Sequence, residues 1–504
     1  MKKLEDRKSG GLSGTAIFQS IVVSFLFVLL FSYSTSPLYD YKEKVVDSYI
    51  FQTIGKYWND GVIPYIGLFD HKGPIIFFIN ALGYALTGNR YGIFILQVIS
   101  LSFTIMIMLK MYCQEFSWKK AWIITGVSLI GYLAGYTGGN LTEEYILPFL
   151  MLAFYFWKKW NDEVLLNLQE MYHKPTIALL YGAIIGIAVM TRVTNAIGVC
   201  FIVLFVTIFL IRYHKWKNLW ENILMFCIGI AVIIIPFTIY FTIHDSMYDM
   251  WFGTIGMNVS YMENSKSFFE SLSFKKIIIF AMYFFSCYSM LFAGILLLRN
   301  KKRRILSIFM IVTSCITCIM YMRGRAYSHY CMVCLPYFVI SVLELKKMEN
   351  EKSLSYRSVF LKRVIVLFSF FYMIGGVWSV KTIYDDVVEM KIDNSVGDLM
   401  DYVPMEERNS FIAWQCPTYL YLKYDIVPYY RYFILQNSQT KISEQLKNEV
   451  VEMFQYGDVK WIMVADGHQK TIKKILDDRY VCVKSKMGEK RKYLLYHLKE
   501  GNID

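Results

Sequence analysis

Residues 220–243 read WENILMFCIGIAVIIIPFTIYFTI, and Glu221 is the only charged side chain among them. An α-helix rises about 1.5 Å per residue, so about 20 apolar residues cross the roughly 30 Å hydrocarbon core of a bilayer. The stretch is therefore long and apolar enough to span a membrane.

Ten other stretches of the chain are similarly apolar, although several are short and would depend on packing against their neighbours. The composition agrees, since 56% of the residues are hydrophobic and 18% are charged, against roughly 45–50% and 25% in globular proteins. We predict a mainly α-helical, polytopic membrane bundle of about eleven spans. The ten other stretches lie at approximately 15–33, 91–111, 121–137, 144–157, 176–190, 195–212, 276–298, 304–322, 329–345 and 363–381.

The composition and the net charge exclude several other classes of protein. Disordered, collagen-like and disulfide-framework chains need more Pro, Gly or Cys than the 10, 30 and 10 residues present here. The formal charge of +13 does not indicate nucleic-acid binding, because residues 382–504 carry 17 basic and 19 acidic residues and the excess lies in residues 1–381. There the basic residues mostly occupy short loops between apolar stretches, which is typical of membrane topology.

The positions of Lys and Arg also predict how the chain crosses the membrane. With a cytoplasmic N-terminus and residues 74–88 lying on the outer surface or re-entering it, 20 basic residues from Lys110 to Lys381 face the cytoplasm and 7 face outward. These numbers would be exchanged if residues 74–88 spanned the membrane. No convincing cleavage site follows the first apolar stretch, which favours an uncleaved first span over a signal peptide. Nearly every candidate for chemistry then lies on the outer side.

The first outer loop contains a predicted amphipathic helix at the membrane interface, beginning near Asp47. The apolar positions of this segment recur at helical spacing and so lie on one face. A carboxylate close to low-dielectric lipid is costly unless it is used or paired, which makes Asp47 a candidate general base. The alternative is that Asp47 caps or solvates the helix. The apolar positions are Val46, Tyr49, Ile50, Ile54 and Tyr57.

The sequence Asp70-His71-Lys72-Gly73-Pro74 follows in the same loop and precedes the stretch 74–88. Proline suits the first position of a helix, and a helix N-terminus beside a lysine suits a phosphate. His71 and Lys72 are therefore candidate substrate-binding residues. The alternative for Lys72 is a lysine that extends along the interface toward water.

Two further candidates are charged residues close to predicted outer helix ends. Glu143 and Glu144 open the fourth span, where they would either cap the helix or hold a hydroxyl group or a divalent cation. Arg192 lies in a short outer turn, against the trend of positive charge inside. It would bind an anionic ligand such as phosphate, or pair with a carboxylate such as Glu143.

A second outer turn, RGRAYSH at residues 323–329, carries Arg325, Tyr327 and His329. Arg325 is a phosphate-binding candidate for the same reason as Arg192. The aromatic residues are candidates for substrate contact, or else belong to an ordinary aromatic belt at the interface.

The cysteine spacing does not predict a metal site. Cys315-x2-Cys318 and Cys331-x2-Cys334 lie inside apolar helices and lack the polar, glycine-containing turns of zinc ribbons. Loops of the GxGxxG or Walker type and serine nucleophile elbows are absent from the sequence, so a soluble nucleotide is not an obvious substrate.

The tail from residue 382 is predicted to form a small extracytoplasmic α/β domain, because short apolar strands alternate with helical stretches. Its only cysteines, Cys416 and Cys482, could pair in an oxidising compartment. We divide the chain into a transmembrane catalytic module, residues 1–381, and this domain, residues 382–504. Strands are predicted at 411–414, 461–465, 479–484 and 492–498, and helices around 441–455 and 468–478.

Taken together, these motifs resemble the GT-C glycosyltransferases of the protein O-mannosyltransferase and lipid A aminoarabinose transferase type, over roughly residues 15–345. VVDSYIFQTIGKYWNDGVIPY is similar to an acidic outer-loop helix of that family, and DHKGP to its His-Lys-Pro-Pro-like turn. GGNLTEE, TRVTN and RGRAYSHY resemble its later acidic, basic and aromatic-basic-His motifs. This sequence has Ser48 where the family often has a second acidic residue, and Gly73-Pro74 where it often has two prolines.

The resemblance implies a GT-C-like fold and the transfer of a sugar from a polyprenyl monophosphate to an acceptor hydroxyl, with inversion, at the outer face of the membrane. Asp47 would act as the general base. A divalent cation is the candidate cofactor, its ligands are not assigned, and Ser48 weakens the expectation of metal dependence. The substrate-binding residues would be Lys72, Arg192 and Arg325 for the departing phosphate, His71, Tyr327 and His329 for the phosphate or the sugar, and Glu143 or Glu144 for the acceptor or the cation.

The expected partners are a polyprenyl-phosphate sugar donor, a glycan, lipid or protein acceptor, and membrane lipid, with no nucleic acid. We expect a multi-pass cell-membrane protein whose C-terminal domain is extracytoplasmic and whose reaction modifies cell-envelope glycans or glycolipids. The alternative functions are a polysaccharide polymerase or ligase using a lipid diphosphate, a carrier of lipid-linked sugars, and a non-enzymatic envelope scaffold.

The predicted topology is tested by cysteine accessibility. In a variant without reactive cysteines, Lys302→Cys is expected to react with a membrane-impermeant maleimide only after the cells are permeabilised, because residues 299–304 face the cytoplasm in this topology. Ser265→Cys, in a predicted outer loop, is the control and should react in intact cells. Labelling of Lys302→Cys in intact cells would contradict the topology.

Overall fold

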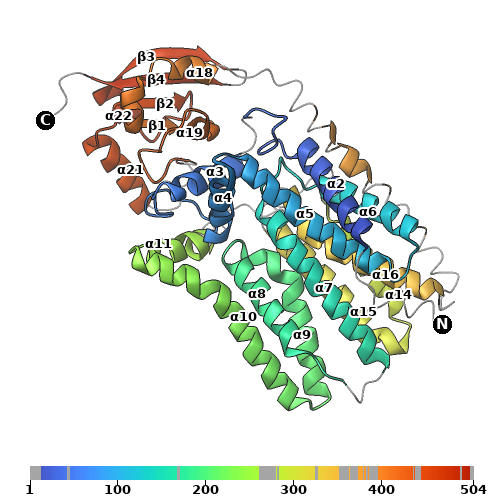
Figure 1. Ribbon diagram of the computed structural model, residues 1–504. Helices are drawn as coiled ribbons and strands as arrows, with labels where there is room; N and C mark the ends of the chain where they lie inside the picture. The colour runs from blue at the N-terminus through green and yellow to red at the C-terminus, as the bar shows by residue number, and fades with distance from the viewer. Residues whose placement is uncertain are drawn as a thin grey trace. The chain divides into compact units, whose positions relative to one another are not determined.

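The protein is described by a computed structural model, which divides into two compact units (Figure 1). The first, here called the bundle unit, comprises residues 1–32, 94–239 and 265–383, and the second, the sheet unit, comprises residues 33–93, 240–264 and 384–504. The structure describes residues 13–41, 46–166, 171–259, 280, 283–323, 327–350, 363, 370, 373–378, 380–381, 384, 395–434, 436, 444–488 and 491–499.

Helices occur at ten of the eleven predicted spans, and the eleventh, 363–381, lies partly outside the described residues. Six helical segments of the described chain are long and apolar enough to cross a membrane. The membrane-bundle class is thereby confirmed, and the number of spans stays a prediction. The bundle helices are α2 (Gly14–Phe31), α5 (Tyr91–Tyr112), α6 (Trp118–Leu133), α7 (Thr142–Leu166), α8 (Pro175–Val189), α9 (Ile197–Arg212), α10 (Trp216–Ile243), α14 (Phe285–Leu297), α15 (Arg304–Arg323) and α16 (Leu335–Asn350), with short helices η1 (Val193–Ala196), η4 (Lys301–Arg303) and η5 (Ser328–Cys334).

Glycines bring two helices of the bundle unit into close contact. A Cβ atom added at Gly182 of α8 would lie 2.0 Å from the carbonyl oxygen of Phe226, and one added at Gly229 of α10 would lie 2.1 Å from that of Leu179. Only glycine fits at such distances. Small residues spaced four apart, such as Gly182 and Gly186, are the usual means by which helices approach closely in lipid.

Aromatic side chains fill the space between α7, α9 and α15. The ring of Trp157 lies 4.3 Å from that of Phe309 and 5.8 Å from that of Phe205, measured between centroids. Trp157 is fully buried. Such large rings provide the dispersion contacts that hold helices together where lipid removes the hydrophobic driving force.

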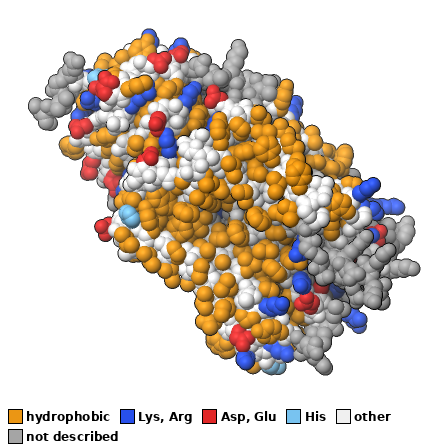
Figure 2. Space-filling model, in the orientation of Figure 1, with side chains coloured by type: hydrophobic (Ala, Val, Ile, Leu, Met, Phe, Trp, Pro, Cys, Tyr) orange, Lys and Arg blue, Asp and Glu red, His pale blue; other side chains and the backbone are white. Residues whose placement is uncertain are grey.

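The outer surface of the bundle unit is apolar. Only 6% of the most hydrophobic part of α10 is buried within the protein. Figure 2 shows hydrophobic side chains covering the visible face of α8–α10, with charged side chains toward their ends. A helix that exposes apolar residues on most of its surface requires an apolar surrounding, which a bilayer provides.

The sheet unit contains the four-stranded sheet of the tail, in the order β1-β2-β4-β3. Strands β1 and β2 are parallel and fully buried, whereas β4 is antiparallel to both of its neighbours. The four predicted strands and the helix predicted around 441–455 are confirmed, the helix predicted around 468–478 begins at Lys473, and the predicted domain boundary at residue 382 lies outside the described residues. The elements are α3 (Val46–Asn59), α4 (Pro74–Thr87), α11 (Met247–Trp251), the π-helix η2 (Phe252–Gly256), α18 (Ser395–Met400), η7 (Met405–Ser410), β1 (Phe411–Trp414), α19 (Tyr419–Lys423), α21 (Glu444–Tyr456), β2 (Trp461–Ala465), α22 (Lys473–Arg479), β3 (Tyr480–Met487) and β4 (Lys492–Leu498).

The predicted amphipathic helix is α3, and its apolar face is buried inside the protein. Tyr49, Ile50, Ile54 and Tyr57 are each 1% exposed. Gly55 allows close contact with α4, because a Cβ there would lie 2.5 Å from the Cβ of Asn80. This face therefore packs against protein, although its spacing was equally suited to lipid.

A buried ion network joins α7, η4 and α16 of the bundle unit. Lys158 Nζ lies 2.6 Å from Asp162 and 2.8 Å from Glu344, and Arg303 lies 3.3 Å from Glu344. Lys158 and Glu344 are 3% and 1% exposed. Buried charges of this kind persist only when they are compensated by opposite charges.

Removal of one partner should therefore destabilise the bundle. Glu344→Ala leaves Lys158 and Arg303 without one of their counter-charges, and we expect the free energy of unfolding to fall by about 3–5 kcal/mol. The control is Glu349→Ala, which breaks an exposed pair with Lys346 and should cost less than about 1 kcal/mol. Chemical unfolding in detergent measures both changes. If Glu344→Ala lowered the free energy of unfolding no more than Glu349→Ala does, the buried network would not be important for stability.

Candidate functional site

Asp47 lies in the first turn of α3, where the positive end of the helix dipole favours a carboxylate. The side chain is half-buried. Within the described part of the chain, no hydrogen bond or ion pair of its carboxylate is found. The neighbouring Ser48 accepts a hydrogen bond from Gln52 at 3.0 Å. Asp47 thus offers, among the described residues, an acceptor group without a hydrogen-bond partner at a helix start, which is suited to a general base.

His71 and Lys72 lie together in the turn that precedes α4. Lys72 Nζ is 2.8 Å from His71 Nε2, and His71 Nδ1 is 3.1 Å from the carboxylate of Asp70. Pro74 occupies the first turn of α4, as predicted. Burial alone would raise the pKa of Asp70, but His71 and, to a smaller extent, Lys72 hold it well below its usual range. The turn therefore carries an ionised carboxylate beneath two basic side chains.

The main chain of this turn is held by residues from two other segments of the sheet unit. Tyr65 Oη donates to the carbonyl oxygen of Lys72 at 2.8 Å, and Asn258 Nδ2 donates to that of His71 at 2.7 Å. Gly253, in the π-helix η2, lies close to this turn, because a Cβ there would be 2.9 Å from the Tyr65 ring and 3.0 Å from the carbonyl oxygen of Asp70. The main chain at His71 and Lys72 is therefore held by hydrogen bonds and close packing.

In the bundle unit, Arg192 is the centre of a second cluster. Its Nη1 atom lies 3.2 Å from Glu143 Oε1 and 3.3 Å from His329 Nε2. Its guanidinium group lies 3.7 Å from the centre of the Tyr330 ring, a cation–π contact. The pairing of Arg192 with Glu143, one of the two alternatives considered from the sequence, is present in the structure.

Glu144 faces a different environment from Glu143. One of its carboxylate oxygens accepts from the main-chain nitrogen of Leu141 at 2.9 Å, and the other accepts from Gln97 Nε2 at 2.8 Å. Gln97 also donates to Tyr136 Oη at 3.1 Å. The side chain of Glu144 is 4% exposed. It therefore caps the start of α7, while Glu143 pairs with the arginine.

The turn after α15 is described in part. The rings of Tyr327 and His329 stack, with centroids 5.5 Å apart and an interplanar angle of 13°. Tyr327 is 40% exposed. Arg325 lies outside the described residues. His329 is thus the member of this turn that joins the Arg192 cluster.

The predicted residues therefore form two groups, one in each unit. Asp47, His71 and Lys72 belong to the sheet unit, and the group of Glu143, Glu144, Arg192, Tyr327 and His329 belongs to the bundle unit. Asp70 was not identified from the sequence, although its position directly before His71 could have indicated it. Gln97 and Asn258 were not identified either, because no sequence pattern indicated them.

The described residues contain no group of three or more His, Cys, Asp or Glu side chains placed to hold a metal ion. Cys315, Cys318, Cys331 and Cys334 lie in helices and form no disulfide among the described residues. Cys416, after β1, and Cys482, in β3, do not form the disulfide considered from the sequence. The residues described here do not fit a metal centre, and the divalent cation stays a prediction.

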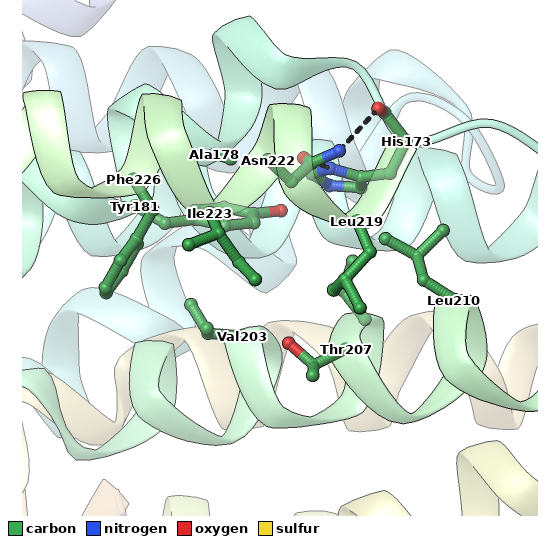
Figure 3. A pocket seen from close by; sticks show the side chains of 11 residues that line it. His173, Ala178, Tyr181, Val203, Thr207, Leu210, Leu219, Asn222, Ile223 and Phe226 are labelled. Carbon is green, nitrogen blue, oxygen red and sulfur yellow. Dashed lines mark hydrogen bonds between the residues drawn. The ribbon is translucent and has the colours of Figure 1, made fainter. Parts of the chain in front are cut away.

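A separate cavity of about 60 Å³ lies between α8, α9 and α10 (Figure 3). His173 lines it at the start of α8, whereas Arg192 follows the end of the same helix, so the cavity does not belong to the Arg192 cluster. His173 Nδ1 lies 2.5 Å from Asn222 Oδ1, and Asn222 Nδ2 donates to the His173 carbonyl oxygen, as Figure 3 shows. The imidazole is fully buried.

The fold is shared with solved membrane transferases. ArnT from Cupriavidus metallidurans, bound to undecaprenyl phosphate, superimposes with a TM-score of 0.54 at 12% identity, covering 96% of this chain and 98% of that one. Its apo state gives a TM-score of 0.54 at 11% identity, covering 95% and 97%. The oligosaccharyltransferase AglB from Archaeoglobus fulgidus, in complex with an inhibitory peptide and a dolichol-phosphate, gives 0.48 at 9% identity, covering 91% of this chain and 70% of that one.

The fold is that of the GT-C membrane glycosyltransferases, and the fold class predicted from the sequence is confirmed. No protein-family model matches the chain. No curated protein sequence matches it either.

The buried histidine predicts a pH dependence of stability. Burial lowers the pKa of His173 to about 4, although the hydrogen bond with Asn222 opposes this shift. Between the ordinary value of about 6.5 and about 4, the unfolded chain binds a proton that the folded protein does not. The free energy of unfolding should therefore decrease by about 3 kcal/mol as the pH falls through this range.

The measurement is chemical unfolding in detergent between pH 7 and pH 4, on the parent protein and on His173→Gln. The variant lacks the titrating group, so the difference in free energy of unfolding between parent and variant should become smaller or change sign as the pH falls. A constant difference over this range would contradict the assignment.

Proposed function

We propose that this protein transfers a sugar from a polyprenyl-monophosphate donor to an acceptor hydroxyl on the outer side of a membrane. The observation that carries the proposal is a fold shared over 96% of the chain with ArnT, whose solved structure contains undecaprenyl phosphate. The carboxylate of Asp47, at the start of α3, and the paired His71 and Lys72 support it, because they supply a base and a cation for a phosphate.

In this proposal Asp47 is the catalytic base. It takes the proton of the acceptor hydroxyl as the hydroxyl oxygen attacks the anomeric carbon, and the bond from that carbon to the phosphate oxygen breaks, which inverts the configuration. A half-buried carboxylate without a competing partner among the described residues is suited to this role.

Negative charge develops on the departing phosphate, and fixed cations stabilise it. Lys72 and Arg192 would supply these charges, together with Arg325, and His71, Tyr327 and His329 would orient the phosphate or the sugar. The ion pair with Glu143 fixes the direction of the Arg192 side chain, so that little reorganisation is needed when the anion binds.

Glu143 and Glu144 would hold the acceptor or a divalent cation. Both carboxylates already have partners, Glu143 with Arg192 and Thr142, and Glu144 with Leu141 and Gln97, so either would exchange a contact for the ligand. In the cell membrane, with the reaction on the outer side, the acceptor would be a glycan, glycolipid or protein of the envelope.

The proposal is tested by the release of free polyprenyl phosphate from a panel of polyprenyl-monophosphate sugars, with an envelope fraction as the acceptor. Asp47→Asn is expected to lower the rate at least about 100-fold, because the base is lost while the shape is kept. Asp60→Asn, just beyond the other end of α3, is the matched control and should keep the parent rate.

Three outcomes would contradict the proposal. Equal activity of Asp47→Asn and the parent would remove the base assignment. Release from lipid diphosphates alone would indicate a polymerase or ligase. Transport of the intact lipid-linked sugar across vesicles, with no release, would indicate a carrier.

A further inference from the structure

Asp70 is a buried carboxylate to which the mechanism above gives no role. It is 1% exposed, and in the described part of the chain no donor forms a well-aligned hydrogen bond with either of its oxygens. The basic atom that lies against it is His71 Nδ1, at 3.1 Å. A buried carboxylate is expensive without such a partner, so its presence here requires an explanation.

The contacts of His71 determine which of its ring nitrogens donates. A carboxylate only accepts hydrogen bonds, so Nδ1, which faces Asp70, carries the hydrogen. An ammonium group only donates, so Nε2 accepts from Lys72 Nζ at 2.8 Å. The ring is therefore held between an acceptor and a donor, and both its tautomer and its orientation are determined.

The contact with His71 restricts the side chain of Lys72. The main chain of the turn is already held by Tyr65 and Asn258, but the lysine side chain is a flexible four-carbon stem. Its contact with His71 is the only hydrogen bond of the ammonium group among the described residues. One of its three hydrogens points to the ring, and two are left for an anion.

From these contacts we propose that Asp70 is a positioning residue, which acts through His71 to place the ammonium group of Lys72 against the phosphate of the lipid donor. The inference rests on the proposed function. Asp70 itself touches neither substrate. A positively charged group that is already in place when the phosphate departs lowers the barrier more than one that must be ordered at that moment.

The test is a double-mutant cycle on the full-length protein in detergent or vesicles. Asp70→Asn keeps the shape of the side chain and removes its charge, and Lys72→Met removes the ammonium group. We expect each single variant to lower kcat/KM for the donor by about 10- to 100-fold, with the larger part of the change in kcat. Because Asp70 acts through Lys72, the double variant should be no slower than Lys72→Met alone.

A purely structural role for Asp70 gives a different result. Its effect would then appear as a lower unfolding temperature, and any loss of activity would add to that of Lys72→Met in the double variant. Asp249→Asn is the matched control, because it removes a half-buried carboxylate of the same unit that pairs with Arg431. It should leave kcat/KM unchanged.

A second variant protects the test against misfolding. If Asp70→Asn does not fold, Asp70→Ser removes the same carboxylate and replaces Asp70→Asn in the cycle with Lys72→Met. Additive losses in the cycle would overturn the inference while leaving the proposed function intact. A folded parent protein that releases no polyprenyl phosphate from any donor would overturn the proposed function and this inference together.

Discussion

Lipid offers no hydrogen bonds to a polypeptide, and most of this structure follows from that constraint. Backbone groups in the hydrocarbon must be satisfied within each segment, which leaves helices as the elements of the bundle unit. Because lipid is as apolar as the side chains, the helices are held by close packing. Glycines at the contact of α8 with α10, and the rings of Trp157 and Phe309, provide it.

The same constraint decides where charges occur. Lys158 and Glu344 are buried near the ends of their helices and pair with each other, because an isolated charge in a low dielectric is too costly. Arg192 and Glu143 form another such pair, at the opposite end of the bundle from His173. The first pair is fully enclosed, whereas the side chain of Arg192 is 22% exposed and can still meet an anion.

The turn at residues 70–72 is held in place by hydrogen bonds from other segments of the sheet unit. Its carbonyl oxygens accept hydrogen bonds from Tyr65 and Asn258. Among its side chains, the ring of His71 lies between the carboxylate of Asp70 and the ammonium group of Lys72. In the proposed reaction this order is useful, since the phosphate leaves a bound sugar and must be met by groups that do not move. Asp47 needs the opposite property, a carboxylate that is not yet engaged.

The sequence by itself determined the class of fold, most element positions and the candidate residues, because these depend on local patterns. Apolar length predicted the helices, short apolar runs predicted β1 and β2 at their observed bounds, and Pro74 marked the start of α4. Only the tertiary structure decided which of two adjacent carboxylates meets the arginine. Glu143 pairs with Arg192 and Glu144 with Gln97, because successive residues of a helix point about 100° apart. Nor could the sequence connect Asn258 with His71, which lie 187 positions apart and meet only through packing.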